Sequence, residues 1–303
     1  MNGVLLIDKP SGPTSHDAVA RLRKTSGERR IGHTGTLDPL ASGLLVLVLG
    51  QATRLATFLS GHDKSYEAII QLGTTTDTDD ARGVVTDTWS GALPGVEALD
   101  TAIGGFAGTY LQMPPQHSAK RVDGVKAYEL ARRDKPVDLK AVEVSVKALE
   151  RTSLEGNRVG LRLTATSGFY VRSLARNLGE QLGCGAHLAA LRRTSVGPFL
   201  VQDAQPLQDA ERAGSGIEAH VIPAAQALPD WPSATVNEAG MTRALHGNPL
   251  SPLHLTSPWG RWPATSDDGG TRPIRVRILD AAGGLVALAE ARGAALHPVV
   301  VLM

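Results

Sequence analysis

Hydrophobic and polar positions follow two different patterns in the first part of this chain, and each pattern predicts a kind of strand. Residues 44–49 form a continuous apolar run between Gly43 and Gly50, which is typical of a strand buried on both faces. Residues 64–72 alternate apolar and polar side chains and indicate a strand with one buried face. Residues 4–8 predict another short apolar strand. We therefore expect a buried sheet to begin near the N-terminus.

Further elements follow from the same patterns. Strands are expected at residues 142–149, 158–165, 275–280, 285–290 and 299–303. Helices are expected at residues 14–24 (opened by a capping box), 51–60, 96–106, 124–133 and 168–182, with a polar loop at 74–83 and an extended segment at 112–115. Because several strands follow one another through short turns, the order favours an α+β fold with a mixed, largely antiparallel central sheet.

Composition changes near residue 229, where charged residues become rare and Pro and Gly become frequent through residue 273. With 303 residues, the chain is long enough for one large domain and one small one. We expect a catalytic domain over residues 1–228 and a small β-rich domain over residues 229–303.

Overall composition indicates a packed globular protein, with 42% hydrophobic and 20% charged residues. The single cysteine, Cys184, excludes an intrachain disulfide and suits a reducing cytoplasm. The first apolar run is too short for a signal peptide, and no segment approaches the length of a membrane span. The expected location is therefore the cytoplasm, with no membrane partner.

The net charge of +1 does not by itself predict a nucleic-acid partner. Residues 119–140, however, hold seven Lys and Arg residues against four Asp and Glu residues, a local excess of three. Two Arg pairs, Arg29–Arg30 and Arg192–Arg193, lie outside this stretch. A local excess suits a polyphosphate backbone, whereas a charge-rich run is equally typical of a solvated helix face.

The most informative chemical feature is a loop of Gly, Thr and Pro residues at 32–43 (GHTGTLDPLASG) that carries one carboxylate, Asp38. An Asp before a Pro is by itself an ordinary turn residue that bonds its own backbone. At the edge of the buried strand 44–49, however, it would be held rigidly enough for chemistry. The chain has no Cys/His metal spacing, Walker loop or dinucleotide fingerprint, so we expect no metal or cofactor.

Two strings in order, GVLLIDKPSGPTS at 3–15 and the loop at 32–43, resemble the opening of the TruB family of tRNA pseudouridine synthases. Residues 167–176 (SGFYVRSLAR) are similar to another motif of that family. The resemblance implies a pseudouridine synthase fold with a small C-terminal PUA-like RNA-binding domain. It also implies isomerisation of the T-loop uridine at position 55 of tRNA by C–N bond cleavage, rotation of the base and C–C bond formation.

The same resemblance implies roles for residues of the active site. Asp38 matches the essential catalytic aspartate, and Arg172 matches the arginine that pairs with it and would orient it. Tyr66 matches the tyrosine that stacks on the flipped base, Tyr170 a second aromatic residue of the pocket, and Leu191 its apolar floor. From the residues alone, Tyr66 and Leu191 are equally well read as core residues.

The resemblance also implies that His33 binds the substrate, through contact with the folded T-loop. The other expected RNA contacts are Lys64, Arg54, His117, Lys120, Arg121, Arg132 and Arg133. His117 stands where the family usually has Tyr and Arg121 where it has Lys, within an insertion at about 112–140 that resembles the segment closing over the tRNA. Lys9 is expected to be structural, and the acidic loop 76–83 to be structural or adjacent to RNA, since it lacks the Gly and Glu of a calcium-binding EF-hand.

The expected partner is tRNA, through its T-arm and, at the C-terminal domain, its acceptor stem, with a monomeric protein and no obligate protein partner. A guide-dependent relative of the same fold, a tRNA-folding chaperone and a carboxylate hydrolase are the alternative functions. The sequence leaves open whether Asp38 attacks the sugar, attacks the base or abstracts a sugar proton.

Overall fold

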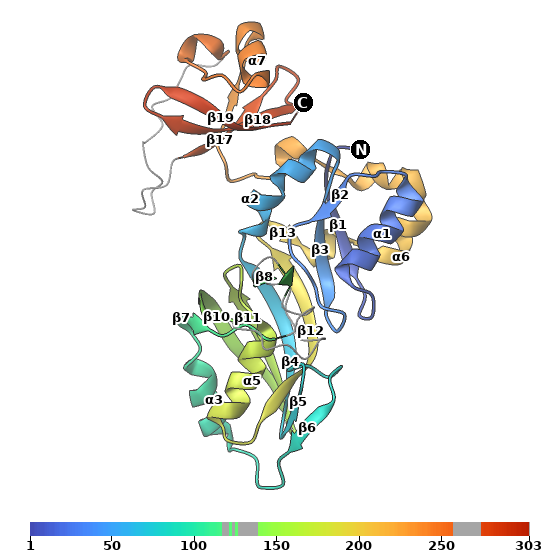
Figure 1. Ribbon diagram of the computed structural model, residues 1–303, viewed down its shortest axis with the longest axis vertical. Helices are drawn as coiled ribbons and strands as arrows, with labels where there is room; N and C mark the ends of the chain where they lie inside the picture. Colours follow the sequence, from blue (N-terminus) through green and yellow to red (C-terminus); the bar gives the residue numbers. More distant parts are fainter. Residues whose placement is uncertain (117–120, 123–124, 127–138, 257–273, 303) are drawn as a thin grey trace.

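The computed structural model describes residues 1–116, 121–122, 125–126, 139–256 and 274–302. Within these residues an eleven-stranded sheet forms the centre of the molecule, and a separate four-stranded sheet lies towards the C-terminus (Figure 1). The large sheet runs in the order β14-β1-β3-β12-β4-β11-β10-β7, with β2, β13 and β15 paired beside this path. Its strands are β1 (Gly3–Lys9), β2 (Ile31–His33), β3 (Ser42–Leu49), β4 (Lys64–Leu72), β7 (Gly108–Gln112), β10 (Val142–Glu155), β11 (Arg158–Ala165), β12 (Ala186–Val196), β13 (Phe199–Leu200), β14 (Gln205–Pro206) and β15 (Ile222–Pro223).

Helices cover this sheet in two groups (Figure 1). α1 (Ser15–Ser26) and α6 (Leu207–Ala213) pack on β1 and β3, whereas α3 (Val96–Gly104) and α5 (Val171–Gln181) pack on the strands from β4 to β10. The remaining described helices are α2 (Ala56–Ser60), α7 (Glu238–Leu245) and the 3-10 helices η1 (Gly50–Leu55), η2 (Val201–Asp203), η3 (Gly214–His220), η4 (Ala224–Gln226) and η5 (Pro252–His254). Two small hairpins pair β5 (Thr74–Thr76) with β6 (Val85–Thr88) and β8 (Arg121–Val122) with β9 (Val125–Lys126).

The expected fold class is confirmed. β1 pairs in parallel with β14, and β3 in parallel with β12, while the other neighbouring strands of the large sheet are antiparallel. The strands expected at 4–8, 44–49 and 64–72 are present, and those expected at 142–149 and 158–165 form an antiparallel pair.

The buried strand β3 shows why its sequence is apolar at every position. Leu44, Val46 and Val48 pack into one core, which includes residues of the C-terminal sheet. Leu45, Leu47 and Leu49 on the opposite face pack against the α1 side. Because successive side chains of a strand point to opposite faces, a continuous apolar run serves two cores at once.

Several expected boundaries are wrong. The helix at 51–60 is a 3-10 helix until Leu55, the loop at 74–83 begins with strand β5, and the helix at 168–182 begins at Val171. At the start of the helix expected over 124–133 the structure has strand β9, and the rest of that prediction lies outside the described residues.

The long central strand β12 was not predicted. Its arginine pair and the register shifts at Leu188/Ala190 and Arg193/Ser195 interrupt the alternation that would reveal a strand in the sequence.

The C-terminal sheet has the order β16 (Ser233–Thr235), β17 (Arg275–Leu279), β18 (Leu285–Arg292), β19 (Ala295–Val301). It confirms a β-rich C-terminal region, while the boundary at residue 229 and the PUA-like assignment stay predictions. Trp231 packs edge-on against Phe58, and Arg275 lies over both rings at 5.1–5.5 Å, which attaches this region to the larger one. None of the helices in the described segments is long and apolar enough to span a membrane.

Candidate active site

The loop that carries Asp38 is fixed by backbone hydrogen bonds at several points. The Asp38 carbonyl accepts from the amide of Ala41 at 3.0 Å, and the Pro39 carbonyl accepts from the amide of Gly12 at 2.8 Å. The Ser15 hydroxyl donates to the Leu37 carbonyl at 3.1 Å and accepts from the Leu37 amide at 2.8 Å. Since Ser15 begins α1, the loop is tied to the first helix as well as to strand β3.

A cavity of about 310 Å³ opens beside this loop. Its walls come from the loop itself, β4, the segment before α5, and β12. The lining residues are Thr34–Asp38, Ser60, Lys64, Tyr66, Ser167–Arg172, Leu191 and Arg193. The structure therefore brings together Asp38, its expected partner Arg172 and the three residues expected to surround the base: Tyr66, Tyr170 and Leu191.

Asp38 forms an ion pair with Arg172. The distance from Arg172 Nε to Asp38 Oδ2 is 2.8 Å, and the arginine side chain is 5% exposed whereas the aspartate side chain is 37% exposed. α5 begins at Val171, so Arg172 is its second residue and lies where the helix meets the cavity. One partner is thus held in the protein interior while the carboxylate remains accessible.

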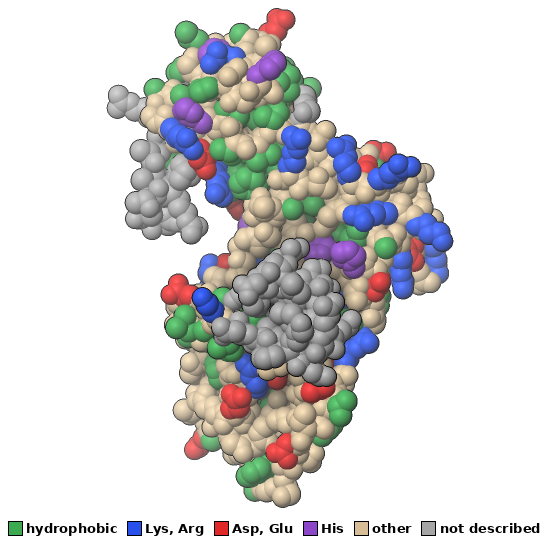
Figure 2. All heavy atoms as spheres, viewed as in Figure 1, with side chains coloured by type: hydrophobic (Ala, Val, Ile, Leu, Met, Phe, Trp, Pro, Cys, Tyr) green, Lys and Arg blue, Asp and Glu red, His purple; other side chains and the backbone are tan. Residues whose placement is uncertain are grey.

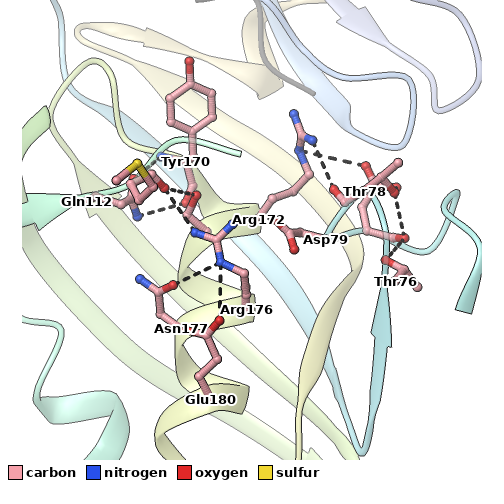
Figure 3. A network of polar contacts seen from close by, with 12 residues as sticks. Thr76, Thr78, Asp79, Gln112, Tyr170, Arg172, Arg176, Asn177 and Glu180 are labelled. Carbon is pink, nitrogen blue, oxygen red and sulfur yellow. Dashed lines mark hydrogen bonds and ion pairs between the residues drawn. The ribbon is translucent and has the colours of Figure 1, made fainter. Parts of the chain in front are cut away.

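A second carboxylate supports Arg172, although the residues around it do not indicate this role. Asp80 Oδ2 lies 3.9 Å from Arg172 Nε, and Arg172 Nη1 donates to the Thr78 carbonyl at 3.2 Å (Figure 3). Asp80 is itself held by the Thr78 hydroxyl and by the amide of Arg82, both at 2.9 Å. The acidic loop therefore has a structural role beside the cavity.

Arg176 lies one turn after Arg172 on α5 and anchors the same loop (Figure 3). It pairs with Asp79 at 2.8 Å and, more weakly, with Glu180 at 3.8 Å, the partner that an ordinary surface arginine would have. Burial raises the pKa of Asp79, and the nearby positive charge of Arg176 partly offsets this increase. Asp79 also has a left-handed backbone, with φ of 60°.

The backbone of Tyr170 is fixed by a buried amide side chain. Gln112 Oε1 accepts from the Tyr170 amide at 2.8 Å, and Gln112 Nε2 donates to the Tyr170 carbonyl at 3.1 Å (Figure 3). Gln112 is fully buried at the end of β7. These two hydrogen bonds fix the backbone from which the Tyr170 side chain projects at the cavity.

Tyr66 and Leu191 belong both to the core and to the cavity wall. Tyr66 is 8% exposed within the core cluster that includes α5, and burial raises the pKa of its hydroxyl. Leu191 is half-buried in β12 and packs at the edge of two core clusters. The two interpretations from the sequence, core residue and pocket residue, are therefore compatible for both Tyr66 and Leu191.

Comparison with known proteins assigns the family. Residues 23–171 match the family described as TruB family pseudouridylate synthase (N terminal domain), and residues 172–228 match the tRNA pseudouridylate synthase B C-terminal domain. A Solibacter usitatus protein named tRNA pseudouridine synthase B is 39% identical over 305 residues, covering 100% of each chain. A Thermobifida fusca protein of the same name is 40% identical over 309 residues, covering 99% of this chain and 98% of its own.

The chain belongs to the TruB family of pseudouridylate synthases.

Solved structures agree with this assignment. A chain from a Cbf5–Nop10–Gar1 complex superposes with a TM-score of 0.74 at 28% identity, covering 99% of this chain and 85% of its own. A chain from an H/ACA ribonucleoprotein bound to a substrate RNA containing 2'-deoxyuridine gives a TM-score of 0.73 at 25% identity, with the same coverage.

Two lysines of this TruB family member are buried near Asp38: Lys64 lines the cavity, and Lys9 interacts electrostatically with the Asp38 carboxylate. Lys64 Nζ donates to the carbonyls of Ser60 at 3.0 Å and His62 at 2.7 Å, and Lys9 Nζ donates to those of Pro10 at 2.8 Å and Pro13 at 2.9 Å. Burial lowers the pKa of each lysine to about 8. The contacts of Lys9 agree with the structural role expected for it.

The other expected RNA contacts lie outside the described cavity lining. His33 is half-buried at the end of β2, and Arg54 in η1 donates to the carbonyl of Val301 in the C-terminal sheet. Arg121 belongs to strand β8. His117, Lys120, Arg132 and Arg133 are outside the described residues.

Proposed function

We propose that this TruB family member isomerises the uridine at position 55 in the T-loop of tRNA to pseudouridine, without a guide RNA, and that Asp38 is the essential carboxylate. The observation that carries the proposal is the accessible Asp38 carboxylate, paired with buried Arg172 at the wall of a cavity that also contains Tyr66 and Tyr170. The names of the homologues, tRNA pseudouridine synthase B, support tRNA as the substrate.

The reaction rearranges bonds without adding or removing atoms overall. The bond from the ribose C1' to N1 of uracil breaks, the base rotates, and C1' bonds to C5. The C5 hydrogen leaves as a proton, and N1 acquires one. A single carboxylate could act in any of three ways: it could attack the sugar, attack the ring of the base or abstract a proton from the sugar.

The cavity must receive a base that has left its stack. Tyr66 offers an aromatic face for stacking, which contributes about 1–3 kcal/mol per base in single-stranded recognition. Leu191 would form the apolar floor beneath the base, and Tyr170 would close another side. The buried guanidinium of Arg172 would hold the Asp38 carboxylate in one orientation as the base rotates.

Surface charge supports binding to a polyanion despite the small net charge. Lys and Arg side chains gather over the part of the molecule formed by α1 and α6 (Figure 2). Arg21 and Lys24 on α1, and Arg29 and Arg30 shortly after it, are exposed. A local excess of this kind attracts a phosphate backbone.

Other parts of the interaction remain predictions within this proposal. The T-arm contacts are proposed for His33, Lys64, Arg54, His117, Lys120, Arg121, Arg132 and Arg133. The C-terminal region is proposed as a PUA-like domain over 229–303 that binds the acceptor stem, and the enzyme as a cytoplasmic monomer.

The test uses an unmodified full-length tRNA transcript and no other RNA. After reaction, carbodiimide treatment and primer extension should show one stop, at the T-loop uridine, and none in a transcript with cytidine at that position. Product that appears with a guide RNA but not without one would support the guide-dependent alternative. Tight binding without product under either condition would favour the chaperone alternative.

A further inference from the structure

Arg192 and Arg193 are adjacent in β12 but point to opposite sides of the sheet. The Arg192 side chain is 40% exposed and pairs with Asp8 at 2.7 Å. Arg193, in contrast, is 2% exposed and lines the active-site cavity. From the sequence, the two residues form a basic pair that would suit a phosphate backbone. In the structure, Arg193 is buried and contacts other parts of the protein instead of solvent.

The guanidinium of Arg193 contacts the chain on both sides of Asp38. Its Nη2 donates to the Gly35 carbonyl at 3.1 Å, and its Nη1 donates to the Thr36 carbonyl at 3.4 Å. Its Nε donates to the carbonyl of Leu44 in β3 at 2.7 Å. One side chain thus connects the part of the loop before Asp38 to the strand that follows the loop.

The same guanidinium lies close enough to the hydroxyl of Tyr66 on β4 to interact with it electrostatically, and both side chains line the cavity. Arg193 therefore lies between the segment that holds the carboxylate and the aromatic ring proposed to stack on the base. The backbone of Arg193 also packs closely against the end of the loop, since a Cβ added at Gly43 would lie 2.2 Å from the Arg193 carbonyl oxygen.

The chemistry of these partners favours arginine. Among the residues that the structure describes, Arg193 makes no ion pair, so three backbone carbonyls accept the hydrogen bonds of its buried guanidinium. A planar guanidinium can bond several oxygens in fixed directions, which a lysine ammonium cannot do with the same geometry. A buried charge stabilises a protein less than well-packed apolar residues do. Stability alone therefore does not explain why an arginine is buried at this position.

We propose that Arg193 is a positioning residue, which fixes the Asp38 loop through its hydrogen bonds to backbone carbonyls and holds that loop next to the Tyr66 ring. This inference rests on the proposed function of Asp38 for its effect on the rate. A displacement of about 1 Å at the reacting groups can reduce a rate about 100-fold. Arg193 acts through Asp38 and Tyr66, and its loss should lower the rate of the chemical step rather than RNA affinity.

The test compares Arg193→Lys and Arg193→Met with the neighbouring control Arg192→Met. The first readout is hydrogen–deuterium exchange of residues 34–41 in the free protein, which needs no activity. The second is the single-turnover rate of pseudouridine formation in a T-stem-loop RNA, and the third is the Kd for that RNA at two salt concentrations. Thermal unfolding identifies folded variants, and Arg193→Lys carries the test if Arg193→Met does not fold.

We expect faster exchange at residues 34–41 and a rate lowered about 100-fold in Arg193→Met and about 10-fold in Arg193→Lys, with Kd changed less than about 3-fold. Arg192→Met should retain the wild-type exchange and rate. Unchanged exchange in a folded Arg193 variant would overturn the proposal, as would faster exchange with an unchanged rate. A higher Kd with a salt dependence reduced by about one ion would overturn it in favour of a phosphate contact.

Failure of the proposed function would look different. If the wild-type protein forms no pseudouridine, faster exchange in the variants still supports loop positioning by Arg193. The assignment of Asp38 chemistry, and not the role of Arg193 in the loop, would then be wrong.

Discussion

Replacing Gln112 with Leu should destabilise the protein and displace Tyr170. The Gln112 side chain is fully buried and makes two hydrogen bonds with the Tyr170 backbone, at 2.8 and 3.1 Å. Leucine has nearly the same size but neither accepts nor donates, so the Tyr170 amide loses this acceptor. The Tyr170 carbonyl keeps its other donor, the Leu174 amide at 3.2 Å.

The magnitude follows from these two losses. A buried amide deprived of its partner costs about 1–3 kcal/mol, and the lost bond to the carbonyl costs about 1 kcal/mol. Burying the more apolar leucine side chain in place of glutamine offsets about 1 kcal/mol of this loss. We therefore expect the free energy of unfolding to fall by about 2 kcal/mol, and the Tm by about 4 °C at about 2 °C per kcal/mol for a chain of this size.

Urea unfolding and differential scanning calorimetry would measure the loss of stability, and single-turnover kinetics would measure the rate, expected to fall about 10-fold. The matched control is Leu111→Gln, at an exposed neighbouring position on β7, which should change stability by less than about 0.5 kcal/mol. A Gln112→Leu protein as stable as the wild type would refute the argument that this amide satisfies the Tyr170 backbone.

Two further predictions concern the charged groups at the cavity. Asp80→Asn should lower the single-turnover rate about 10-fold with little change in RNA Kd, because it removes a negative charge 3.9 Å from Arg172 Nε. The control Asp87→Asn, on the exposed strand β6, should keep the wild-type rate. An Asp80→Asn protein with the wild-type rate would contradict this prediction. Burial lowers the pKa of Lys64 from 10.5 to about 8. Between about pH 8 and pH 10.5 this lysine is therefore more protonated in the unfolded chain than in the folded protein. Its contribution to the free energy of unfolding consequently rises with pH. From pH 7 to 9 the wild type should gain about 1 kcal/mol over Lys64→Met in urea titrations, and the exposed control Lys24→Met should keep the wild-type gain.

Much of the fold could be predicted where the pattern is local. The apolar run of β3, the alternation of β4 and the capping box at Thr14 each reflect a rule that acts within a few residues, and each is present in the structure. The 3-10 geometry of η1 was not predicted, because the spacing of its apolar residues also fits an α-helix.

The support of the site could not be predicted, because it depends on residues distant in the chain. Asp80 lies beside Arg172, 92 positions later, and the acidic loop by itself gives no sign of this partner. Arg193 has the same local sequence whether it faces solvent or the interior. The register of β12 against β3 and β4 decides between these orientations, and register is a property of the assembled sheet.

The most direct test of the central claim measures release of tritium from C5 of uridine in a T-stem-loop RNA, with wild type, Asp38→Asn and the exposed control Asp87→Asn. The account predicts release by the wild type and by Asp87→Asn, and none above background by Asp38→Asn, although that variant should still bind the RNA. Release by Asp38→Asn at the wild-type rate would contradict the account and remove Asp38 from the essential role.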